Sequence, residues 1–165
     1  MVRTPRPPST DEAADRISAY VYGNILLLAA LVVLSRHDVL DGAGLAIVGG
    51  TALSTFVAHA FAERLGAEAR GSTHASWGSV LRDSVPILSS AAVPALLMLV
   101  GSLDWASPTI CLRLAEAWIV VRIALAGFVV GRLQGRPVSL RTWLASAGLA
   151  VAALLVVALK VVLTH

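Results

Sequence analysis

The sequence has few of the residues that hold together a disulfide framework, a zinc site or a charged soluble surface. It contains a single cysteine, Cys111, so no disulfide can form within the chain, and no Cys/His cluster has zinc spacing. Only 14% of the 165 residues are charged, whereas 57% are hydrophobic. This composition departs far from the average of soluble domains, so it predicts a protein whose main surroundings are lipid.

Catalytic and nucleotide-binding motifs are also absent from the sequence. It contains no G-x-S-x-G, H-E-x-x-H, Walker or dinucleotide-binding pattern. Ser54 and His59 lie at the wrong helical angle to act as a nucleophile and its base. The net charge is +3, but the basic residues stand between apolar runs rather than in a patch with interleaved aromatic residues. We therefore expect neither an enzyme nor a nucleic-acid-binding protein, and no bound cofactor.

Five apolar runs follow a polar, proline-rich opening. Each run has roughly 18 to 22 residues, which at about 1.5 Å per residue is enough to cross a hydrocarbon core of about 30 Å. The third run contains Pro94, which predicts a kink because proline leaves a backbone carbonyl without its donor. The predicted fold is all-α, a polytopic integral membrane protein with a bundle of five transmembrane helices in residues 16–165, behind a flexible cytoplasmic tail of residues 1–15. The predicted spans are 17–35, 43–63, 85–103, 110–130 and 143–163, and the longest internal polar segment lies between Glu63 and Ser84.

The basic residues predict the orientation in the cell membrane. With the N-terminus in the cytoplasm and the C-terminus outside, nine basic residues fall in cytoplasmic segments and three outside, as the positive-inside rule favours. Tyr20 and Tyr22 are expected near the membrane surface, where amphipathic rings are enriched. The cytoplasmic residues are Arg3, Arg6, Arg16, Arg64, Arg70, Arg82, Arg132, Arg136 and Arg141, and the outer ones are Arg36, Arg113 and Lys160.

The second run, from Gly42 to Arg64, carries three rows of residues at four-residue spacing. A row of small side chains is predicted to face protein, because such rows let helix backbones approach closely in lipid. A polar row is predicted to avoid lipid and is a candidate transport pathway, and a row of large apolar side chains suits acyl chains or a packed neighbour. The small row is Gly42, Ala46, Gly50, Ser54, Ala58 and Ala62; the polar row is Thr51, Thr55, His59 and Glu63; the large row is Leu45, Gly49, Leu53, Val57, Phe61 and Leu65.

Arg122 is predicted near the middle of the fourth span, where a charge costs about 2.5 to 3.5 kcal/mol. Glu116 lies about 9 Å away along the same helix, and the two side chains point about 120° apart. Each is expected to need a partner on another helix or access to water. The candidate partners of Arg122 by depth are Asn24, His59 and Glu63. Arg122 is then either a structural pin between helices or part of an ion or substrate pathway. The candidate residues of such a pathway are Asn24, Thr51, Thr55, His59, Glu63, Glu116 and Arg122.

His59 and Glu63, four residues apart, reach the same side of their helix. They are candidate ligands of a divalent metal or members of a proton relay, since histidine titrates near neutral pH. The alternative is structural: His59 bonds a backbone carbonyl and Glu63 marks the cytoplasmic end of the helix. Two ligands alone do not complete a metal site.

The order of these parts resembles the vacuolar iron transporter family. The resemblance is carried by RISAYVYGN in the first run, GGTALSTFVAHAFAE in the second and GRLQGRPVSLRTWLASAGLAVAA between the fourth and fifth. It implies the five-span fold and a homodimer that transports metal. The family's Asn-Asp-Gly would fall at Ile25 to Leu27, its Ser-Met pair reads Ser54-Thr55, and an acidic position is His59. These departures imply that the fold carries over better than the iron activity.

Two hypotheses for function follow from the sequence. The first is a divergent transporter of this class, in the bilayer as a monomer or homodimer, that moves a small cation or proton along the polar row of the second run. The second is a non-transporting membrane module whose polar residues hold helices together or meet a partner subunit. Access of water to Thr55 and His59 discriminates between them.

Overall fold

The computed structural model describes residues 10–69 and 77–133, together with five single residues further on, Leu144, Gly148, Val151, Leu155 and Ala158. Within these residues the chain is helical and contains no strand, so the prediction of an all-α fold is confirmed for this part. The helices are α1 (Thr10–Val33), α2 (Arg36–Leu40), α3 (Ala43–Ala69), α4 (Trp77–Ser102) and α5 (Pro108–Leu133).

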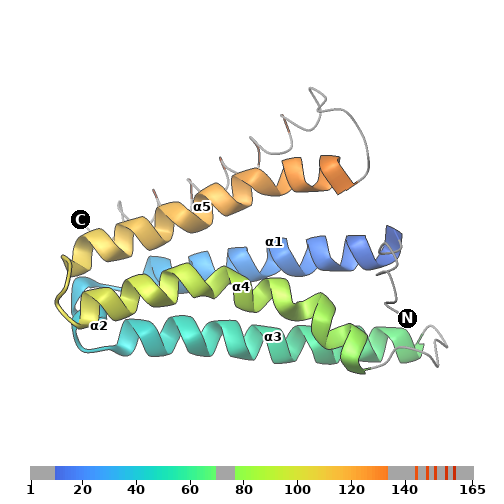
Figure 1. Ribbon diagram of the computed structural model, residues 1–165, viewed down its shortest axis with the longest axis horizontal. Coiled ribbons are helices and arrows are strands. Elements are labelled where there is room, and N and C mark those ends of the chain that lie inside the picture. The colour runs from blue at the N-terminus through green and yellow to red at the C-terminus, as the bar shows by residue number, and fades with distance from the viewer. Residues whose placement is uncertain are drawn as a thin grey trace, which may run out of the picture.

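The four long helices run antiparallel to their sequence neighbours (Figure 1). The short helix α2 and the α4–α5 connection lie at one end of the bundle, and the start of α4 and the end of α5 lie at the other. Helix α4 packs against α1, α3 and α5, and α1 also packs against α3 and α5. Among the described residues, α3 and α5 do not pack against each other. Among the described residues, α3 and α5 are therefore linked through α1, α4 and the short helix α2.

The core fills the half of the bundle near α2. It is built from large aliphatic side chains and one methionine, which come from every long helix and bury apolar area that would otherwise face the surroundings. Its members include Leu27, Leu31, Val48, Met98, Ile119 and Ile123, all at most 2% exposed.

Helix α4 accommodates both Pro86 and Pro94 without a break in the helix. Pro94 is fully buried. Figure 1 shows that α4 bends along its length, as expected where proline removes a backbone hydrogen bond. The bend lies in the part of α4 that faces the polar residues described below.

The long helices extend beyond the predicted spans into polar sequence. Helix α3 continues to Ala69 and α4 begins at Trp77, so much of the polar segment between Glu63 and Ser84 is helical. Alanine, glutamate and arginine are strong helix formers, and Arg64 Nε lies 3.0 Å from Glu68 Oε1 one turn later. Hydrophobicity marked the apolar part of each helix and missed these polar ends.

Helix α1 likewise begins at Thr10, inside the stretch predicted to be a flexible tail. Asp11 and Glu12 follow directly, and acidic residues in a first turn are favoured by the helix dipole. Residues Thr10 to Asp15 of the predicted tail are therefore helical, and residues 1–9 lie outside the described part of the chain.

Two described helices are long and apolar enough to cross a membrane, Ala43–Ala69 and Val80–Ser102, and Ile17–Val33 is a shorter apolar helix. In their apolar windows only 22% and 39% of residues are buried, whereas the core helix of a soluble protein is mostly buried. In α5 the apolar sequence is interrupted by Arg113, Glu116 and Arg122. The prediction of five spans remains a prediction, because the fifth run falls mainly outside the described residues.

The turn into α3 is fixed by a capping box at the start of α2. The Ser35 amide and hydroxyl donate to Asp38 Oδ2 at 2.7 and 2.6 Å, and the Asp38 amide donates to Ser35 Oγ at 3.4 Å. This reciprocal pattern satisfies backbone groups that a helix start leaves open. The hydrogen bonds from Ser35 hold the pKa of Asp38 below its usual value of 3.8.

We predict that Ser35→Ala raises the pKa of Asp38 toward 3.8. Because the folded-state pKa is depressed, the carboxylate stabilises the turn above about pH 3.8, and this contribution is lost as the pH falls through the folded-state value. NMR titration of the Asp38 carboxyl in the two proteins measures the shift. Ser102→Ala is the control, since the Ser102 hydroxyl donates to the Leu99 carbonyl within α4 and is not part of the capping box of Ser35 and Asp38. An Asp38 pKa that is the same in Ser35→Ala as in the wild type contradicts the prediction.

Candidate functional site

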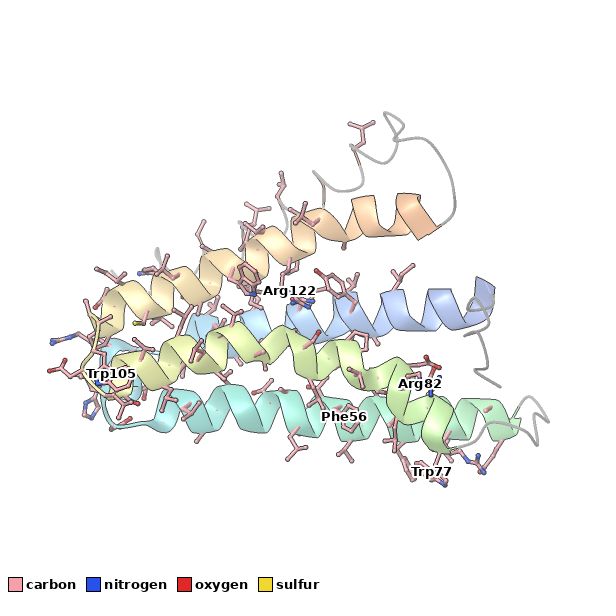
Figure 2. The ribbon with its side chains drawn as sticks, viewed as in Figure 1. Phe56, Trp77, Arg82, Trp105 and Arg122 are labelled. Atoms are coloured by element: carbon pink, nitrogen blue, oxygen red, sulfur yellow. The ribbon has the colours of Figure 1, made fainter. Side chains whose placement is uncertain are left out.

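Arg122, which is half-buried, joins three helices, with one partner, Asn24, in the interior and the other, Ser89, on an exposed part of α4. From α5, its Nε donates to Asn24 Oδ1 of α1 at 3.0 Å, and its Nη2 and Nη1 reach the hydroxyl and carbonyl oxygens of Ser89 of α4 at 3.3 and 3.5 Å. Figure 2 shows the side chain between α5 and α1. Asn24 is fully buried, so the hydrogen bond satisfies an amide oxygen that has no access to solvent. Asn24 was among the predicted partners of Arg122, and this pairing is confirmed.

Tyr20 completes the arrangement around Arg122. Its hydroxyl donates to the Arg122 carbonyl oxygen at 3.0 Å, and Arg122 Cζ lies 4.8 Å from the centroid of its ring, a cation–π distance. The Asn24 side-chain amide donates to the Tyr20 carbonyl at 2.6 Å. That bond turns the Asn24 Oδ1 toward the guanidinium. We call Tyr20, Asn24, Ser89 and Arg122 the arginine cluster.

The Tyr20 side chain reaches across to α5, and its predicted depth near the membrane surface stays a prediction. Tyr20 and Asn24 are four residues apart and share the face of α1 that meets α5. Tyr22 points elsewhere: it is 49% exposed, and its ring centroid lies 6.4 Å from that of His59 on α3.

Ser89 lies on α4 between Pro86 and Pro94. Pro94 has no N–H to donate to the carbonyl of Ser90, so the preceding turn departs from regular helix bonding. Ser90 is buried, and its hydroxyl donates to the Ile87 carbonyl. Ser89 in the same turn presents both its hydroxyl and its carbonyl oxygen to Arg122. A charged donor in the bundle thus meets α4 where proline disturbs its hydrogen bonding.

Glu116 does not belong to the arginine cluster. Its Oε2 lies 2.9 Å from Arg113 Nη1, three residues earlier on the same helix, and the carboxylate is 3% exposed. Arg113 on the same helix supplies one partner of Glu116, and the expectation of a partner on another helix or of access to water stays a prediction. Side chains three residues apart on a helix are neighbours. Arg113 is half exposed, so this pair links the interior to the α2 end of the bundle.

The polar row of α3 faces the bundle, as predicted. Thr55 is buried, and Thr51, His59 and Glu63 are half-buried. The large apolar row lies outside, with Leu53, Val57 and Phe61 all more than half exposed. α3 therefore presents hydroxyl, imidazole and carboxyl groups inward from a helix whose outer surface is apolar.

The small-residue row of α3 is also outside, so no described helix of this chain covers it, and its predicted contact with protein stays a prediction. Ala46, Gly50, Ser54, Ala58 and Ala62 are exposed. A Cβ added at Gly50 would meet nothing within 4 Å. The buried face instead passes through Val48, Ala52 and Thr55, because burying Val48 removes more apolar area from the surroundings than burying glycine.

The seven predicted pathway residues thus fall into three groups. Asn24 and Arg122 are joined, Glu116 pairs with Arg113, and the row Thr51, Thr55, His59 and Glu63 lies on α3, which does not pack against α5. The sequence analysis missed Tyr20 and Ser89. The four-residue spacing of Tyr20 from Asn24 places both on one face of α1, but spacing does not specify that this face meets α5 or that Ser89 lies opposite Arg122.

His59 and Glu63 are the candidate metal ligands, and in residues 10–69 and 77–133 no three His, Cys, Asp or Glu side chains are grouped closely enough to hold a metal ion. We predict that the purified protein binds divalent iron, manganese or zinc no more tightly than roughly millimolar, the weak end for oxygen-ligand sites. Titration calorimetry at neutral pH measures this, with His59→Ala and Glu63→Gln as comparison variants. Micromolar binding that either variant abolishes contradicts the prediction.

Comparison with known proteins gives this chain no relative: no family model, no curated protein and no solved structure matches it. The resemblance to the vacuolar iron transporter family therefore rests on the quoted motifs alone and stays a prediction.

Proposed function

We propose that this chain is a multi-pass membrane protein whose long helices cross the bilayer. The proposal is supported by the apolar outer surface: large exposed side chains occur on all four long helices and continue along α3 from Ile47 to Leu65. In water such a continuous apolar surface would drive aggregation, whereas in lipid it needs no partner. Charged residues gather at the two ends, with Arg64 and Arg82 at one and Arg36 near the other.

The proposed orientation has the N-terminus in the cytoplasm and the C-terminus outside. Reporter fusions after Gly71 and Gly135 should then report a cytoplasmic position, and fusions after Asp104 and His165 an external one, because the arginine-rich segments stay inside. An external fusion at Gly71 contradicts this orientation.

We further propose that the bundle moves a proton or a small cation along the inner row of α3. The observation that carries this proposal is the inward position of Thr55, His59 and Glu63 on a helix whose outer face is apolar. Polar groups inside a membrane are costly and are retained where they line a pathway or hold helices together. The Tyr22 ring near His59 adds a further hydroxyl-bearing side chain to the threonines of the row.

The second candidate function is a non-transporting module that packs with a partner, including another copy of itself. The arginine cluster favours it, because Arg122 is engaged by Asn24, Ser89 and Tyr20 as a pin between three helices. The exposed small-residue row of α3 offers a face through which a second copy could approach closely.

Proton flux into reconstituted vesicles tests the transport proposal. After a pH jump, vesicles with the wild-type protein should equilibrate faster than empty vesicles, and His59→Ala and Glu63→Gln should abolish the difference. Glu68→Gln is the matched control, since Glu68 is on the same helix but more than half exposed and bonded to Arg64. Wild-type flux equal to that of empty vesicles favours the packing module instead.

A further inference from the structure

Two exposed tryptophans lie at opposite ends of the bundle (Figure 2). Trp77 opens α4 and is 53% exposed, and Trp105 lies in the α4–α5 connection and is 76% exposed. The backbone at Trp105 is fixed even though its ring is not covered: its amide donates to the Val100 carbonyl at 3.1 Å, after Asp104 at a φ of 57°. A large exposed indole on a fixed backbone suggests that the environment outside the bundle favours an indole ring.

Trp77 is held by an arginine from the neighbouring helix. Arg64 Cζ of α3 lies 5.6 Å from the centroid of the Trp77 ring, and Arg64 Nε also lies 3.0 Å from Glu68 Oε1. This contact ties the C-terminal part of α3 to the start of α4. It combines an apolar ring with a charged group and a carboxylate, the mixture that suits the boundary between acyl chains and water.

The separation of the two tryptophans matches the thickness of a bilayer. From Trp77 to Ser102, α4 rises about 38 Å at 1.5 Å per residue. A bilayer measures about 40–45 Å with its headgroups and about 30 Å without them. The charged residues Arg82 and Asp83 lie within two turns of Trp77, and beyond them the large exposed side chains of α4 are apolar. These are Val85, Leu88, Leu96 and Leu99.

We propose that Trp77 and Trp105 anchor the bundle in the two headgroup layers of the bilayer, with Arg64 holding Trp77 at the cytoplasmic layer. The inference rests on the proposed membrane placement and adds to it the depth of the bundle. Trp118 supplies an internal reference. It is 40% exposed on α5 and lies about 15 Å along the helix from Pro108, which is the depth of the acyl chains.

Fluorescence quenching in liposomes tests these depths. Three variants each keep one of Trp77, Trp105 and Trp118, with the other tryptophans, including Trp143, replaced by phenylalanine. Trp77 and Trp105 should lose more fluorescence to a spin label at the headgroup than to one in the middle of the acyl chain, and Trp118 should show the opposite order. If a variant does not stay helical by circular dichroism, single Trp→Phe substitutions in the wild type give the same quantities by difference.

The variant Arg64→Gln tests whether Arg64 holds the Trp77 ring in place. In the variant that keeps only Trp77, this change should reduce the preference for the headgroup label, while Trp105 should be unaffected. If the acyl-chain label quenches Trp77 or Trp105 as strongly as it quenches Trp118, the proposal that these residues are headgroup anchors is overturned, but the membrane placement is not. A Trp118 that neither label quenches overturns membrane placement and the anchors together, and the absence of proton flux bears on neither.

Discussion

Arg122→Glu should destabilise the bundle far more than Arg122→Leu. In the wild type, the guanidinium donates to three acceptors, Asn24 Oδ1 and the carbonyl and hydroxyl oxygens of Ser89. A carboxylate in its place would meet acceptors instead of donating to them, and Asn24 cannot simply turn its amide because its nitrogen is bonded to the Tyr20 carbonyl. An uncompensated buried charge costs about 3–5 kcal/mol.

Arg122→Leu has two opposing effects. It removes a charge whose burial in lipid costs about 2.5 to 3.5 kcal/mol, and it leaves the fully buried Asn24 oxygen unsatisfied at a cost of about 1–3 kcal/mol. The net change should therefore be small. Adding Asn24→Leu should then cost less than the same substitution in the wild type, since the two residues are coupled.

Thermal unfolding in detergent, followed by circular dichroism, measures these differences. Arg36→Glu is the control, because it makes the same charge change at an exposed position of α2. Equal losses of stability in Arg122→Glu and Arg122→Leu would show that the hydrogen-bond acceptors around Arg122 do not determine which side chain is tolerated at this position.

Gly101→Ala should destabilise the α2 end of the bundle. A Cβ at this position would lie 2.6 Å from Val39 Cγ1, 3.4 Å from the Cys111 Cβ and 3.5 Å from the Pro108 Cα. Val39 has no exposed surface and a stiff branched side chain, so it cannot move aside. Overpacking of this kind costs about 1–3 kcal/mol.

The second substitution Val39→Ala removes the methyl group that the new Cβ meets. The double variant should therefore recover part of the stability that Gly101→Ala loses. Gly50→Ala is the matched control, because a Cβ there meets nothing within 4 Å and alanine is the better helix former. A Gly101→Ala protein as stable as Gly50→Ala in detergent contradicts the close packing of α2, α4 and α5.

The pairing of Arg122 with Asn24 could be predicted because depth in a helix follows from residue number. Its other partners could not. The contact of Tyr20 with Arg122 depends on which face of α1 meets α5, and the general preference of tyrosine for membrane surfaces does not specify that face. Ser89 depends on the local geometry before Pro94, which sequence spacing does not specify.

The rows of α3 show a second limit. Alternation of polar and large apolar residues predicted which groups face inward, since lipid excludes polar side chains. The small-residue row was predicted to face protein because close helix packing is common in membranes. Within one chain, α3 is instead oriented so that Val48 and Ala52 are buried against the other helices. The ends of α3 and α4 were underestimated because hydropathy detects apolar residues, not helix formation.

The central claim is that lipid covers the outer face of α3 and that water reaches its inner face. Single cysteines at Thr55 and Leu53, in a Cys111→Ala background, test both parts in the native membrane with a small hydrophilic thiol reagent. Thr55 is 7% exposed and Leu53 59% exposed in the chain alone. We predict that the cysteine at 55 reacts and the cysteine at 53 does not. A reactive cysteine at 53 beside an unreactive one at 55 would contradict the account, because it would place the outer face in water and close the inner one.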